Sequence, residues 1–305
     1  MKQQAAPDKP QNLRPTTPRK LASPKSDVVF KHVFGREQNT DLLADFLSSV
    51  LNLDPSEYET ITITDPHLKQ TNAAEKLGIL DLKIHTKTQA VIDVEIQVQD
   101  TKHMRLRTLF YAGKLLAEQF KARRPYSDAR RAIIILICDY THIPENPYCH
   151  NCFTLFNKQK DTCYTEHLEI NVLELPKLTD KDSVDNEKLF GWLTFFKSDK
   201  KEELEMIAKD NPPLKKAVGI LMELSEDESI RMIEESQERL RMDWEDRVWG
   251  AREDGRAEGR VEGRKKEAAN IALKALQDGL PVDTIASITG LTTQEIVSLQ
   301  QRSKD

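Results

Sequence analysis

Two neighbouring segments with strictly alternating polarity most constrain what this chain can fold into. Their sequences are GILDLKIH at 78–85 and AVIDVEIQV at 90–98. A period of two is typical of β-strands with one buried face, and the residues between the segments are sufficient for a turn. We therefore predict a β-hairpin whose polar side chains share one face. These side chains are Asp81, Lys83, Asp93, Glu95 and Gln97.

The segment 26–180 mixes helical and strand patterns. Ser26 is a suitable N-cap for a helix over 27–34, and the apolar run at 131–138 is typical of a strand buried on both sides. The other expected elements are helices at 39–51 and 102–121 and strands at 58–64, 153–156 and 168–175. Their order predicts a mixed α/β core.

The segment 181–250 is expected to be a helical extension with a coiled-coil-like seam. The seam consists of Ile230, Ile233, Leu240 and Trp244. A four-residue repeat containing Glu-Gly-Arg follows in 251–266, and each of its glycines costs a helix about 1 kcal/mol relative to alanine. The repeat is therefore either a marginal helix or a flexible linker.

Glycine turns and a capping-box signature at 292–295 divide 267–305 into three short helices. This spacing is similar to that of a helix-turn-helix module, which would bind DNA, although a module used only for dimerisation has the same pattern. The polar residues of its last helix that would meet DNA are Gln294, Gln300, Gln301 and Arg302.

Composition limits the classes of function. The net charge is −5, but the first 25 residues carry six Lys or Arg, one Asp and five Pro, which predicts a disordered basic arm. This arm either solubilises the chain or contacts phosphate. No apolar run is long enough to span a membrane and no signal-like apolar region begins the sequence, so we expect a cytoplasmic protein with no membrane partner.

Two carboxylates that converge from neighbouring strands form an oxygen-rich site suited to Mg²⁺ or Mn²⁺. Such a site is suited to hydrolysis of phosphodiester bonds, because the metal polarises the phosphate and activates water. The alternative is the solvated polar face of an edge hairpin, which has the same alternating pattern.

Asp81, the run Glu95-Ile96-Gln97, and Arg107 with Tyr111 on the following helix resemble the active site of the PD-(D/E)xK nuclease superfamily. Within it, the chain is similar to the Rpn recombination-promoting nucleases, which are transposase-like proteins. Further segments that carry this resemblance are 27–34, 174–177, the glycine repeat and 289–292. The resemblance implies an α/β fold with a restriction-endonuclease-like mixed sheet flanked by helices, followed by an all-α C-terminal extension.

The resemblance also implies roles for individual residues. Asp81 and Glu95 would bind the metal, with the backbone carbonyl of Ile96 as a third ligand. Gln97 stands where the superfamily has lysine, so its amide could orient water or donate to phosphate but could not supply positive charge. The possible accessory residues are Asp27, Lys83, Arg107 and Tyr111, each of which also has an ordinary structural interpretation. Asp93 is interpreted as a bystander.

A second metal site is also possible from the sequence. Cys149 and Cys152 have the spacing of a zinc knuckle, and Cys163 and His167 supply two further soft ligands. Ordinary reduced cysteines are the default interpretation, because the segment has the pattern of a β-hairpin.

These observations together predict a Mg²⁺- or Mn²⁺-dependent DNA endonuclease that promotes recombination and forms a homo-oligomer through its C-terminal helices. The alternative is a catalytically inactive DNA-binding or scaffold protein that retains the nuclease fold.

Overall fold

The computed structural model describes residues 20–51, 61–64, 81–86, 90–184 and 186–302. Three predicted features lie outside these residues in whole or in part. They are residues 1–19 of the basic arm, the start of the first hairpin strand at 78–80 and the turn at 87–89. The chain forms two compact units, one up to Glu234 and the other from Glu235 to Asp305.

The first unit is built on one mixed six-stranded sheet, with strand order β1-β2-β3-β4-β6-β5. β1, β2 and β3 are antiparallel neighbours, β3, β4 and β6 run parallel, and β5 is antiparallel to β6. The strands are β1 (Ile61–Thr64), β2 (Leu82–Thr86), β3 (Ala90–Gln97), β4 (Arg131–Cys138), β5 (His150–Phe156) and β6 (Cys163–Glu174). The predicted mixed α/β fold is confirmed.

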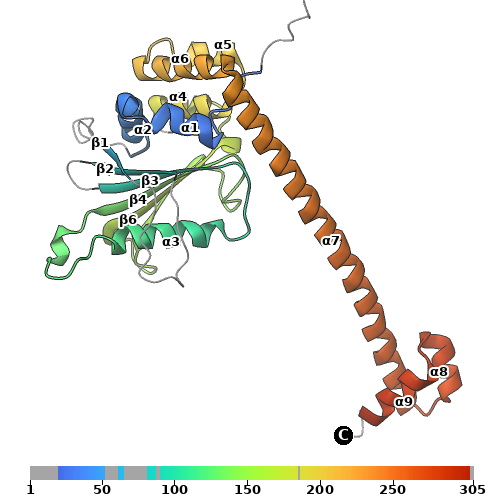
Figure 1. Cartoon of the computed structure of the whole chain (residues 1–305). Helices are drawn as coiled ribbons and strands as arrows, with labels where there is room; N and C mark the ends of the chain where they lie inside the picture. Colours follow the sequence, from blue (N-terminus) through green and yellow to red (C-terminus); the bar gives the residue numbers. More distant parts are fainter. Residues whose placement is uncertain (1–19, 52–60, 65–80, 87–89, 185, 303–305) are drawn as a thin grey trace, which may run out of the picture. The chain divides into compact units, whose positions relative to one another are not determined.

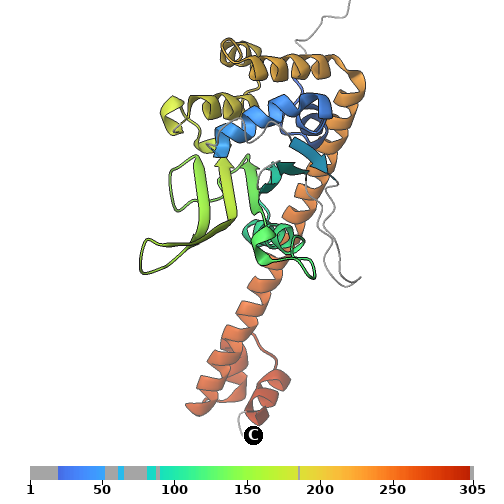
Figure 2. The same ribbon diagram turned by 90° about the vertical axis from the view of Figure 1, so that its left-hand side faces the viewer.

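Helices cover both faces of this sheet (Figures 1 and 2). On one face lie α1 (Asp27–Phe34), α2 (Thr40–Leu51), α4 (Glu187–Lys197), α5 (Lys201–Ile207) and α6 (Pro212–Glu226). On the other lies α3 (Met104–Ala117), which packs on β4 and β6. Short 3-10 turns occur at Glu37–Asn39, Tyr126–Asp128, Leu175–Lys177 and Lys181–Ser183. As predicted, Ser26 caps α1, and its side chain accepts a hydrogen bond from Val29 N–H.

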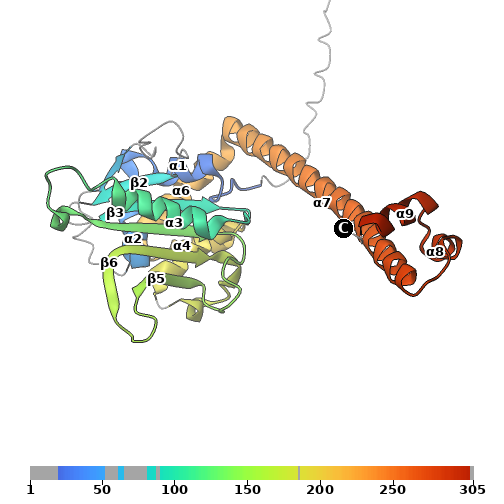
Figure 3. The same ribbon diagram turned by 90° about the horizontal axis from the view of Figure 1, so that it is seen from below.

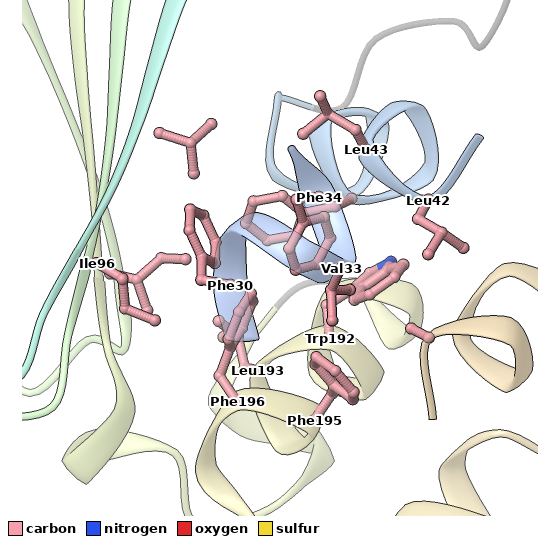
Figure 4. Close-up of a cluster of buried hydrophobic side chains, with 14 of the residues drawn as sticks. Phe30, Val33, Phe34, Leu42, Leu43, Ile96, Trp192, Leu193, Phe195 and Phe196 are labelled. Carbon is pink, nitrogen blue, oxygen red and sulfur yellow. The ribbon is translucent and has the colours of Figure 1, made fainter. Parts of the chain in front are cut away.

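An aromatic cluster joins the helices of the first face to the sheet (Figure 4). The ring of Phe34 lies 5.5 Å from that of Trp192 and 5.7 Å from that of Phe196. Trp192 donates its indole N–H to Asp45 at 2.9 Å, which satisfies the polar atom of a buried ring. Ile96 of β3 points into this cluster, so its neighbours Glu95 and Gln97 face the α3 side of the sheet.

The second unit consists of helices alone, namely most of α7 (Glu228–Gln277), α8 (Val282–Thr289) and α9 (Thr293–Arg302). The Glu-Gly-Arg repeat lies inside α7 and is helical, which is the first of the two alternatives stated for 251–266. Its glutamates and arginines are good helix formers and pair three residues apart, as Arg256 does with Glu253 at 3.2 Å. These contributions offset the cost of the glycines.

The end of the chain forms a small module with its own core of Ala272, Ala275, Ile285 and Ile296. Gly279 and Gly290 have φ values of 79° and 70°, a left-handed conformation that glycine adopts without strain. Thr292 and Glu295 exchange the hydrogen bonds of a capping box before α9. The first of the three expected helices is the end of α7 rather than a separate helix. No helix in the described part of the chain has the length and apolar character needed to cross a membrane.

Candidate active site

The register of the β2–β3 pair brings Asp81 and Glu95 together. Leu82 pairs with Val94, so the next pair towards the start of β2 is Asp81 with Glu95. Asp81 precedes the first hydrogen-bonded residue of β2, and its Oδ2 accepts the backbone N–H of Ile96 at 3.0 Å. This bond holds the Asp81 carboxylate against the strand that carries Glu95.

Glu95 is buried and Asp81 is half-buried. Glu95 is 1% exposed, and its Oε1 has no hydrogen-bond partner among the described residues. Burial and then the charge of Asp81 raise the pKa of Glu95 from 4.5 to about 8, and the charge of Arg107 opposes this shift only in part. Burial also raises the pKa of Asp81, although the N–H of Ile96 opposes the shift. The face is therefore not the solvated edge that the alternating pattern also allowed.

Asp93 is a third carboxylate on this face. It is fully buried, and neither of its oxygens has a hydrogen-bond partner among the described residues. Burial, followed by the charges of Glu95 and Asp81, raises its pKa well above the ordinary value for aspartate. A buried carboxylate without partners is costly, and the interpretation of Asp93 as a bystander stays a prediction. The available sequence signal was its position on the same strand face as Glu95.

Gln97, Arg107 and Tyr111 surround Glu95. The Gln97 amide donates to Glu95 Oε2 at 3.4 Å, and Arg107 Nη2 lies 3.5 Å from the same oxygen. Arg107 Nε donates to the Tyr111 hydroxyl at 2.9 Å, and its guanidinium carbon lies 5.2 Å from the centre of the Tyr111 ring. The spacing of four residues places both side chains on one face of α3, as the sequence predicted. The Arg107 side chain remains 39% exposed, so it is accessible to a substrate.

Two accessory residues lie near the site, Lys83 on this face and Asp27 on α1 at the opposite face, and each is engaged in an ion pair. Asp27 pairs with Lys31 at 2.7 Å within α1, and its charge contributes to the raised pKa of Asp81. Lys83 lies opposite Asp93 in the register, but its ammonium pairs with Glu118 at 2.7 Å. Sequence reasoning missed Lys31, which is near enough to oppose the pKa shift of Asp81.

The donor set suits a hard divalent cation, because it consists of carboxylate oxygens, one of them buried without a partner. Within the described residues, however, no three His, Cys, Asp or Glu side chains are arranged to hold a metal ion. A metal would therefore need backbone, water or substrate oxygens besides Asp81 and Glu95. The proposed ligand role of the Ile96 carbonyl stays a prediction.

The suggested zinc ligands do not form a comparable group. Cys149 is buried and donates its thiol to the carbonyl of Glu174, whereas Cys152 and Cys163 are exposed. Cys152 pairs with Asn171, and Cys163 pairs with Phe156, at separate levels of the β5–β6 hairpin. The four residues all lie within the described part of the chain, and they do not form a cluster that could hold an ion.

Comparison with known families places this geometry in context. Residues 24–251 match a family model described as PD-(D/E)XK nuclease family transposase. Residues 265–301 match a second model, described as the C-terminal HTH domain of the Rpn/YhgA-like nuclease family. Searches of curated proteins and of solved structures gave no significant match. The resemblance drawn from short motifs is thus confirmed over both units.

Proposed function

The chain belongs to the PD-(D/E)XK nuclease family of transposases and carries an Rpn-type C-terminal helix-turn-helix domain, and from this premise we propose that it is a metal-dependent DNA endonuclease. The observation that supports the proposal best is the pairing of half-buried Asp81 with buried Glu95 beside the accessible guanidinium of Arg107. Carboxylates and a cation at one point on a sheet are what hydrolysis of a phosphodiester requires.

Asp81 and Glu95, with the carbonyl of Ile96, would hold Mg²⁺ or Mn²⁺. The ion would polarise the scissile phosphate and lower the pKa of water. Asp81 is oriented for this role by the N–H of Ile96, and the unpartnered oxygen of Glu95 is available as a ligand. Burial and the charge of Asp81 raise the pKa of Glu95 more than Arg107 lowers it, and a bound divalent ion would relieve this imbalance.

Gln97 and Arg107 would share the tasks that lysine performs elsewhere in the superfamily. The Gln97 amide donates to Glu95 and can orient a water molecule, but it carries no charge. Arg107 supplies positive charge from α3 and can bind a phosphate through two parallel N–H groups. Tyr111 restrains Arg107 through its hydroxyl and its ring. Lys83 remains a possible accessory residue.

Plasmid nicking tests the proposal. Purified protein is incubated with supercoiled plasmid and Mg²⁺ or Mn²⁺, with and without chelator, together with the variants Asp81→Asn and Glu95→Gln. Asp161→Asn, in the exposed turn between β5 and β6, is the matched control. We expect nicking by the wild type and by the control, and loss of nicking in both site variants. Nicking that survives both substitutions would remove the catalytic assignment.

The second candidate is a catalytically inactive DNA-binding or scaffold protein. The helix-turn-helix family match supports DNA binding in this case as well. A wild-type protein that binds DNA but gives no nicking with either metal would favour this candidate. The C-terminal helices would then be the part that acts, either on DNA or in homo-oligomer formation.

A further inference from the structure

A cationic cavity lies on the same face of the sheet as Asp93 and Glu95. It has a volume of about 370 Å³ and is formed by β2, by the end of α3 and by the segment that connects α3 to β4. Figure 3 shows α3 lying across this face of the sheet. The helix packs on β4 and β6, and Glu118, directly after its end, pairs with Lys83 of β2. The cations that line the cavity are Lys83, Lys121, Arg124 and Arg130.

The charge of the cavity is positive after its internal pairs are removed. Lys83 is neutralised by Glu118, so Lys121, Arg124 and Arg130 remain against the single acid Asp128. Lys121 and Arg124 are exposed and make no ion pair with any described residue. This local excess contrasts with the net charge of −5 on the whole chain. It is the kind of site in which a phosphate replaces solvent at a low cost.

The cavity is also held in shape by specific bonds. The side chain of Gln119 both accepts from the backbone N–H of Arg130, at 2.7 Å, and donates to its carbonyl, at 3.1 Å. Arg130 Nη1 in turn donates to the carbonyl of Thr86 at the end of β2. The turn before Arg124 contains Arg123 with φ of 67°, the one non-glycine residue with positive φ in the described part of the chain. Arg130 is thus held in place by the fold, and the backbone N–H of Arg124 donates to the carbonyl of Lys121.

His85 completes the wall of the cavity on β2. Burial, together with the charges of Lys83 and Arg130, lowers its pKa, so the imidazole is neutral at pH 7. A neutral imidazole can donate one hydrogen bond to a phosphate oxygen without adding charge. Val91 and Leu115 form the apolar part of the lining.

The cavity lies along β2 from Asp81, one of the two proposed metal ligands. Asp81, Lys83 and His85 are alternate residues and share a face, so His85 lies about 13 Å along the strand from Asp81. One strand of B-DNA rises about 3.4 Å per nucleotide along the helix axis and also turns about it, so this interval corresponds to at most about four nucleotides. A DNA strand with its scissile phosphate at Asp81 and Glu95 would therefore bring a nearby phosphate to the cavity.

We propose that this cavity binds a backbone phosphate of the DNA strand, a few nucleotides from the phosphate that is cleaved. Arg124 and Lys121 contact the phosphate directly, and Arg130 with His85 sets the position of the strand along β2. The inference rests on the proposed nuclease function for its substrate, but DNA binding by the cavity can be measured without cleavage.

The test measures binding of a fluorescein-labelled DNA oligonucleotide by anisotropy over a range of salt concentrations, with chelator present to prevent cleavage. The variant is Lys121→Ala combined with Arg124→Ala. The matched control is Lys158→Ala combined with Lys160→Ala, which removes the same charge from an exposed turn of the same unit. We expect the slope of log affinity against log salt to fall by about 1 in the cavity variant and to stay unchanged in the control. Arg124→Lys should restore most of the slope lost by Arg124→Ala, because it retains the charge.

An equal fall in both double variants would overturn the assignment, because it would reflect the overall charge rather than a site. An unchanged slope in the cavity variant would also overturn it. So would tight binding of inorganic phosphate at the cavity without any effect of the variant on DNA. If the wild type nicks plasmid while the salt slope of the cavity variant equals that of the wild type, the phosphate site is refuted and the nuclease function is retained. If the wild type never nicks plasmid but the salt slope falls in the cavity variant, the nuclease function is refuted and the cavity is retained as a DNA-binding site.

Discussion

Replacing Glu95 by Gln should stabilise the metal-free protein at alkaline pH while it abolishes nicking. Glu95 is almost fully buried, and one of its oxygens has no partner among the described residues. Ionisation of such a group opposes folding, whereas the Gln side chain has nearly the same shape and no charge. Stability and activity should therefore change in opposite directions at this position.

The pKa of Glu95 determines the magnitude and the pH range of this effect. Its value rises from 4.5 to about 8 on folding, so between these two pH values the folded state keeps a proton that the unfolded state has lost. Stability of the wild type therefore falls as pH rises through this range. At about 1.4 kcal/mol for each pH unit, the loss approaches about 5 kcal/mol at pH 8, which sets the upper limit for the gain from Glu95→Gln. At pH 4.5 and below, the two proteins should be nearly equally stable.

Urea unfolding at pH 5 and pH 8, in the presence of chelator, measures this difference. Trp192 lies in the core of the first unit, whereas Trp244 and Trp249 are exposed on α7, so a Trp244→Phe, Trp249→Phe background makes fluorescence report on the first unit. Glu145→Gln is the control, because Glu145 is exposed and its pKa is lowered, chiefly by hydrogen bonding with Arg105. The reasoning would be refuted if Glu95→Gln did not raise the free energy of unfolding at pH 8, or if it raised this free energy equally at both pH values.

Four other outcomes are expected. Mg²⁺ at about 100 times its Kd should stabilise the wild type by about 2.7 kcal/mol and should not stabilise an Asp81→Asn, Glu95→Gln double variant, as thermal unfolding would reveal. Phe34→Ala should destabilise the first unit by about 3–5 kcal/mol in urea, because Phe34 is buried among five aromatic rings. Thr292→Ala should cost the terminal module about 1 kcal/mol through loss of the helix cap, and faster hydrogen exchange in α9 would detect it. Leu240→Glu, at an exposed position of the predicted seam, should lower the mass measured by light scattering, whereas an unchanged mass would contradict oligomerisation through α7.

Local pattern predicted the elements of the first unit well. The apolar run at 131–138 became β4 with the same bounds, and the hairpin alternation placed Asp81 beside Glu95. These features depend on residues that are near in sequence, where periodicity and capping determine the structure.

Features that depend on distant residues were not predictable in the same way. Alternation indicated which face Asp93 occupies, but not that this face would be buried. The ion pair of Lys83 with Glu118 joins residues 35 positions apart, and it exists because α3 ends over β2. The cationic cavity likewise requires the register of β2, the end of α3 and the connection to β4 at the same time. The helical state of the glycine repeat depended on a balance of small energies that the sequence left open.

Ile96 connects the packing of the aromatic cluster to the position of the Asp81 carboxylate. Its side chain packs in the aromatic cluster (Figure 4). Its backbone N–H donates to the carboxylate of Asp81. A substitution that repacks Phe30 or Phe196 can therefore displace β3 and turn Asp81 without touching any charged residue. Loss-of-function alleles in the interior of the first unit would then report on site geometry as well as on folding. Compensating changes for a damaged active site would be found among the aromatic residues on the opposite side of the sheet.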